Sequence, residues 1–101
     1  EVEPSFPGGD EAWKRYITKV IKEHINEIAA ENKSGTCKVK FIVDKDGTVS
    51  DVKVLSMQGT KLAEAAVEAI KKGPRWNPAK QNGYIVTAYR EQPVTFTISE
   101  N

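Results

Sequence analysis

Few side chains in this chain could do catalytic or metal chemistry. His24 and Cys37 are its single histidine and single cysteine, so neither a histidine pair nor a cysteine cage for zinc can form within it. His24 falls on the apolar stripe of a predicted helix, which favours a packed or rim histidine. Cys37 alternates with Val39 on the inward face of a predicted strand, which favours a buried structural thiol over a reactive one. We therefore predict no catalytic, cofactor-binding or metal-binding residues, and no enzyme.

A short acidic segment, Asp44-Lys45-Asp46-Gly47, could suggest a calcium loop. The EF-hand pattern needs further oxygen ligands and a distant Glu, and these are missing. A hairpin turn fits better, because Asp and Gly are typical turn residues and Gly47 can adopt a positive φ.

Length and composition indicate one small globular domain. The chain has 101 residues, of which 39% are hydrophobic and 29% charged. Its 15 Lys and Arg against 14 Asp and Glu give a net charge of +1, which argues against a nucleic-acid partner. It begins at Glu1 without a Met, so we expect a fragment or a processed product of a longer protein.

The first half of the chain changes from irregular to helical to extended. Two Pro and two Gly in 1–10 predict an extended arm, with Asp10 as the helix N-cap. Apolar residues then recur at steps of three and four over 11–30, which predicts one continuous amphipathic helix. Alternation over 36–43 and 48–56 predicts two strands joined as a hairpin.

The second half repeats the helix–strand pattern. A second helix is expected over 60–72, ended by Gly73 in a left-handed conformation and by Pro74. A polar loop over 75–83 and one long strand over 84–98 follow. Since Pro93 cannot donate a ladder hydrogen bond, that strand should lie at a sheet edge or carry a bulge.

These elements predict an α+β fold with the order α-β-β-α-β. It is a two-layer sandwich, in which a three-stranded antiparallel sheet carries two helices on one face. If the third strand pairs with the first, all neighbours are antiparallel and the third strand becomes an open edge. We divide the chain into an arm, 1–10, and a domain, 11–101.

Several short motifs in a fixed order carry a resemblance to a known family. They are Phe6-Pro7-Gly8-Gly9, Asp46-Gly47-Thr48-Val49, Pro74-Arg75-Trp76-Asn77-Pro78 and Pro93-Val94-Thr95-Phe96. Together they resemble the C-terminal domain of TonB-family energy transducers of Gram-negative bacteria, over nearly the whole chain. The chain departs from the family at three places: Glu23-His24 replaces a Tyr-Pro pair, Ala79 replaces a Gly, and an acidic pair after Leu62 is reduced to Glu64, which Ala63 and Ala65 flank.

The resemblance implies a TonB/TolA C-terminal-like fold and a binding task. Such a domain is periplasmic, anchored to the inner membrane through a segment not present in this chain. It grips the TonB-box peptide of an outer-membrane receptor by β-strand addition. It thereby couples the proton-motive force, supplied by inner-membrane motor proteins, to nutrient uptake. The alternative is a C-terminal sensory or assembly domain of a membrane peptidase-like regulator, with no transport role.

The peptide-binding residues are expected along the last strand. They are Val86, Thr87, Ala88, Tyr89, Arg90, Val94 and Thr95. The competing interpretation is an edge that is merely protected by Pro93 and charges. An open edge also makes a homodimer plausible. Trp76 could anchor a partner, but packing of its loop onto the fold is the favoured role.

Overall fold

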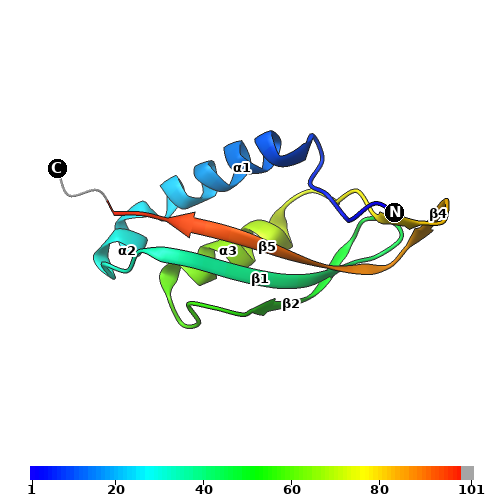
Figure 1. Ribbon diagram of the computed structural model, residues 1–101. Helices are drawn as coiled ribbons and strands as arrows, with labels where there is room; N and C mark the ends of the chain where they lie inside the picture. Colours follow the sequence, from blue (N-terminus) through cyan, green and yellow to red (C-terminus); the bar gives the residue numbers. More distant parts are fainter. Residues whose placement is uncertain (99–101) are drawn as a thin grey trace.

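The computed structural model describes residues 1–98 and has the predicted α+β architecture, with more elements than expected (Figure 1). In chain order the elements are α1 (Gly9–Glu23), α2 (Ile25–Ala30), β1 (Gly35–Val43), β2 (Val49–Val54), α3 (Lys61–Lys72), β3 (Ala79–Gln81), β4 (Tyr84–Val86) and β5 (Ala88–Phe96). The molecule is elongated, with extents of 49 × 24 × 20 Å. No helix within residues 1–98 is long and apolar enough to span a bilayer.

The main sheet is antiparallel with the order β2-β1-β5, which confirms the pairing of the last long strand with the first. Alternate residues of β1 face the helices and are fully buried, among them Val39 and Phe41. The intervening residues, such as Lys38, lie on the opposite, solvent-facing side. The helices therefore cover one face of the sheet and leave the other open, as predicted (Figure 1).

The predicted continuous helix over 11–30 is wrong, because it breaks at His24. There the backbone leaves the helical region (φ −117°, ψ 17°) and separates α1 from α2. The sequence carries no Gly or Pro at this point. After the break Ile28 lies in the core, at 2% exposure, whereas Ile25 of the predicted apolar stripe is 39% exposed.

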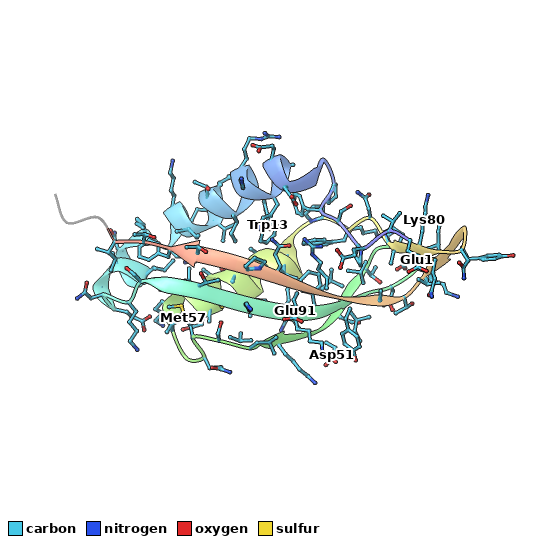
Figure 2. The ribbon with its side chains drawn as sticks, viewed as in Figure 1. Glu1, Trp13, Asp51, Met57, Lys80 and Glu91 are labelled. Carbon is cyan, nitrogen blue, oxygen red and sulfur yellow. The ribbon has the colours of Figure 1, made fainter. Side chains whose placement is uncertain are left out.

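An aromatic cluster joins the N-terminal arm, α1, β1 and the segment after α3. The Trp76 ring lies 5.0 Å from that of Phe41, 5.4 Å from that of Phe6 and 5.6 Å from that of Trp13, centroid to centroid. Trp76 is only 3% exposed, so it packs its segment onto the fold, as the favoured interpretation predicts. Figure 2 shows Trp13 projecting from α1 towards this cluster.

The polar loop predicted over 75–83 and the single strand over 84–98 are both wrong in part. Residues 79–86 form a hairpin of β3 and β4, and β5 begins only at Ala88. Asn82 and Gly83 both have positive φ, the signature of a tight two-residue hairpin turn. The arm pairs with the other side of this hairpin, since the N–H and C=O of Val2 both bond to Lys80 at 2.8 and 2.9 Å.

Two helix ends differ from the prediction. Gly8, not Asp10, is the N-cap of α1, and Asp10 lies within the first turn. Gly73 ends α3 in an extended conformation (φ −81°, ψ −175°), not a left-handed one. Its small size is needed for another reason: a Cβ there would lie 2.9 Å from the Tyr16 hydroxyl, which donates to the Ala69 carbonyl at 2.6 Å.

Gly47 in the β1–β2 turn confirms the predicted positive φ, at +87°. The Asp46 side chain accepts from both the backbone N–H and the hydroxyl of Thr48, and these bonds hold the pKa of the Asp46 carboxyl below its usual range. The Gly47 carbonyl in turn accepts from the Trp76 N–H at 2.9 Å. The acidic segment is thus a turn that locks the loop after α3 onto the hairpin.

Candidate functional site: an open strand edge beside a groove

The register between β1 and β5 fixes which backbone groups face outward. Lys38 directs both its backbone groups at the β2 side, donating to Ser56 Oγ at 2.9 Å and accepting from Leu55 N–H at 2.8 Å. Pro93 lies opposite Lys38, so the two form a non-hydrogen-bonded pair and the Pro93 nitrogen faces the open edge. The prediction that Pro93 marks a sheet edge is therefore confirmed.

The same alternation shows which other residues of β5 point their backbone groups outward. Tyr89, Glu91 and Thr95 share the parity of Pro93, so their backbone N–H and C=O groups also point away from β1. No backbone hydrogen bond within residues 1–98 takes them up. The open edge therefore carries three backbone N–H donors, from Tyr89, Glu91 and Thr95, and four carbonyl acceptors, because Pro93 contributes its C=O as well. These groups are spaced two residues apart, and an added strand needs such groups to pair with.

The β2 edge is a poorer template. The β1–β2 register shifts near Asp51, whose positive φ of 52° marks a bulge, and β2 has six residues against nine in β5. Bulges and short length both blunt an edge against pairing. Of the two edges of the main sheet, β5 therefore offers the longer and more regular strand.

A groove of about 460 Å³ runs between this edge and α1. Trp13, Ile17 and Ile21 form its apolar wall on the helix, while Gln92 and Val94 face it from β5. Since side chains of an added strand alternate between the two faces of the sheet, every second one would enter this groove. The site therefore combines a backbone template with a lined pocket for alternate side chains.

The other face of the edge is more polar. Tyr89 is 60% exposed, and the Lys40 ammonium lies 4.4 Å from the centroid of its ring, a cation–π contact across the sheet. Thr36 and Thr95 join their hydroxyls at 2.9 Å on the same face.

The predicted site residues do not form one continuous surface. Ala88, Tyr89, Arg90, Val94 and Thr95 lie on β5, whereas Val86 ends β4 and Thr87 lies between the two strands. The Val94 side chain is 3% exposed and belongs to the core. It can border the groove but cannot project into it.

Sequence reasoning missed the wall of the groove and part of the edge. Glu91 contributes backbone groups, and Trp13 and Ile17 supply the apolar surface opposite. The strict alternation of β5 could have identified Glu91. The proximity of α1 could not be found, because nothing in the helical pattern says which strand it lies beside.

The candidate chemical residues lie elsewhere. His24 Nε2 is 2.8 Å from Glu68 Oε2 on α3, and Lys72 Nζ is 2.8 Å from the other oxygen of Glu68, so His24 is a rim histidine in a small charged cluster. This cluster borders a hollow of about 590 Å³, larger than the groove. Cys37 is fully buried, and burial raises the pKa of its thiol, as expected for a structural cysteine.

Comparison with known proteins identifies the class of this small α+β domain. Residues 26–98 match the family described as the Gram-negative bacterial TonB protein C-terminal domain, so the chain belongs to that family. TonB C-terminal domains are non-enzymatic and periplasmic. The match covers β5 but not α1, which forms the other wall of the groove.

One solved structure is similar to this chain along most of its length. It is the NMR solution structure of the C-terminal domain of Helicobacter pylori TonB, with 21% sequence identity, coverage of 94% of this chain and 89% of that chain, and a TM-score of 0.46. A search of curated proteins found no match.

Proposed function

We propose that this chain is the periplasmic protein-binding domain of a TonB-family energy transducer. It grips the TonB-box peptide of an outer-membrane receptor by adding the peptide as a strand to β5. Through inner-membrane proton-driven motor proteins it couples the proton-motive force to nutrient uptake. The domain itself has no catalytic role.

The observation that carries the proposal is the open edge of β5. Tyr89, Glu91 and Thr95 present outward backbone groups, and the groove beside α1 receives alternate side chains. Family membership supports the kind of partner, and the backbone geometry supports the mode of binding. Backbone pairing supplies affinity, and the groove supplies selectivity.

A pair of substitutions at one edge position tests the binding mode. Glu91→Pro removes an outward N–H without removing a bond to β1, because the Glu91 N–H faces the open edge. Glu91→Ala changes the same side chain and keeps the N–H. We expect Glu91→Pro to weaken binding of a receptor-box peptide by about tenfold, the scale of one to two backbone hydrogen bonds, in fluorescence anisotropy.

The control and the contradicting result follow from the same geometry. Glu91→Ala should bind within about twofold of the original protein, since backbone groups and not the carboxylate make the contact. Equal binding by Glu91→Pro and Glu91→Ala would exclude strand addition at β5. No binding of any receptor-box peptide by the original protein would exclude the proposed function itself.

A further inference from the structure

We infer that the exposed side of α1 binds the surface of a membrane that contains anionic phospholipids, through Arg15, Lys19 and Lys22. The inference goes beyond the proposed function, because it assigns a second binding surface that does not include the edge of β5. The group that this surface recognises is the phosphate of a lipid head group.

The three cations form one stripe on the side of α1 that faces away from the core. Their spacing of i, i+4 and i+7 aligns side chains along a single helix face. Arg15, Lys19 and Lys22 are all exposed, whereas Ile17 and Val20 on the inward side of the helix are buried. Because α1 lies along one border of the molecule, a large flat partner can reach this stripe (Figure 1).

The stripe surrounds a surface hollow of about 400 Å³. Arg15, Lys19 and Lys22 line this hollow together with Thr18 and Glu23. Arginine and lysine each provide several N–H donors, and the threonine hydroxyl can donate one more hydrogen bond. Charged donors of this kind form strong hydrogen bonds with the oxygens of phosphate and carboxylate groups. The hollow therefore matches an anionic group with several oxygens.

The cations of the stripe are not used within the fold. None of the ion pairs within residues 1–98 includes Arg15, Lys19 or Lys22. The lysines of α3 differ, since Lys61, for example, pairs with Glu64 at 3.3 Å. The positive charge of α1 is therefore available to an outside partner.

Charge is distributed unevenly along α1. Asp10 and Glu11 lie in its first turn, and Glu23 is its last residue. Residues 14–22, between these acids, contain four Lys or Arg and no acid, which gives a charge of +4. Since the whole chain has a net charge of +1, all its other residues together carry −3. Such a local concentration of positive charge attracts the domain to a negatively charged surface and orients it there.

The chemistry of the stripe favours a membrane over a protein as its partner. None of the large hydrophobic side chains that are exposed within residues 1–98 lies on α1. Protein interfaces depend on aromatic and apolar anchors, and they are depleted in lysine. Clusters of Lys and Arg on a helix are instead typical of surfaces that bind anionic lipids.

Co-sedimentation with lipid vesicles tests the stripe. One set of vesicles contains phosphatidylcholine alone, and the other an equal mixture of phosphatidylcholine and phosphatidylglycerol, both at millimolar lipid and low salt. We expect the original protein to bind the mixed vesicles at least about tenfold more strongly, and raised salt to abolish the difference. Lys19→Gln/Lys22→Gln should lose about tenfold or more of this binding, since each Lys near a charged membrane contributes about fivefold.

Matched variants separate position from total charge. Lys45→Gln/Lys80→Gln removes two exposed positive charges that lie outside α1, so both double variants have the same net charge. This control should bind the mixed vesicles within about twofold of the original protein, because binding depends on the stripe. Arg15→Lys should also bind within about twofold, because contact with mobile head groups needs the charge and not the planar guanidinium. Thermal unfolding of each variant establishes that it folds.

Several results would overturn the inference. They are equal binding to the two sets of vesicles, and an equal loss of binding in the two double variants. Full competition by inorganic phosphate would assign the hollow to the free ion, and binding to soluble polyglutamate without binding to the mixed vesicles would assign the stripe to an acidic protein. Binding of a receptor-box peptide is measured separately, so none of these results decides the proposed function at β5.

Discussion

Lys38 and Pro93 face each other across β1 and β5 as a non-hydrogen-bonded pair, which turns the nitrogen of Pro93 to the open edge. The backbone N–H that proline lacks would have pointed to the open edge, where a partner strand would bind. No hydrogen bond between β1 and β5 is therefore lost at this position. The edge therefore has one missing N–H among its outward backbone groups, and a proline on an edge strand is one way in which sheets limit unwanted pairing.

The first prediction concerns that gap. Pro93→Ala adds an outward N–H and should increase self-association through β5, because it completes the edge for pairing with a second copy. Light scattering over a concentration series measures this. The free energy of unfolding should change by less than about 1 kcal/mol, since no bond to β1 is altered. Identical association by both proteins would show that Pro93 does not guard the edge; the homodimer itself stays a prediction.

The second prediction concerns Gly47. A Cβ there would clash with the Trp76 carbonyl oxygen, on a residue with φ +87°. Gly47→Ala should lower the free energy of unfolding by about 2–4 kcal/mol in urea, through clash and backbone strain together. Gly83→Ala is the matched control, because Gly83 has φ +81° with no atom within 4 Å of a Cβ. A loss in Gly83→Ala as large as in Gly47→Ala would contradict the close approach to Trp76.

The third prediction concerns Trp76. Trp76→Ala should destabilise the domain by about 3–5 kcal/mol, because it removes a large buried ring from the aromatic cluster. Tyr84→Ala should cost less than about 0.5 kcal/mol, since Tyr84 is 75% exposed on the β3–β4 hairpin. Chemical denaturation of both variants makes the comparison. Retained stability in Trp76→Ala would favour the alternative, in which Trp76 anchors a partner.

The fourth prediction concerns pH. The hydrogen bond and charge of Lys72, and then His24, hold the pKa of Glu68 below its ordinary value of 4.5. A carboxyl group with a lowered pKa stabilises the fold above its unfolded value and loses that contribution as the pH falls through the folded value. The stability difference between the original protein and Glu68→Gln should therefore shrink as the pH is lowered below about 4.5. A difference that grows on acidification would contradict this assignment.

The sequence predicts the main sheet well because local signals and burial agree there. Alternation in β1 and the Asp46-Gly47 turn specify the hairpin, and Pro93 marks the edge. The β3–β4 hairpin was missed although Asn82-Gly83 is a strong local signal for it. An Asn-Gly pair therefore predicts a hairpin even where the flanking strands are short and polar.

Tertiary contacts decide the features that the sequence could not show. The helix break at His24 has no Gly or Pro in the sequence to indicate it; in the structure His24 pairs with Glu68 at the break, and Ile28 beyond it is buried. The groove depends on α1 lying beside β5. The strand pattern locates Arg90, but only the structure shows that its guanidinium donates to Gln92 Oε1.

Amide hydrogen exchange with and without a receptor-box peptide tests the central claim most directly. In the free domain the N–H groups of Tyr89, Glu91 and Thr95 face the open edge, whereas those of Gln92 and Val94 are already bonded to β1. Strand addition predicts that the peptide slows exchange at Tyr89, Glu91 and Thr95 by about tenfold or more, with little change at Gln92 and Val94. Protection appearing instead around His24 and Glu68, with the three edge amides unchanged, would contradict the account.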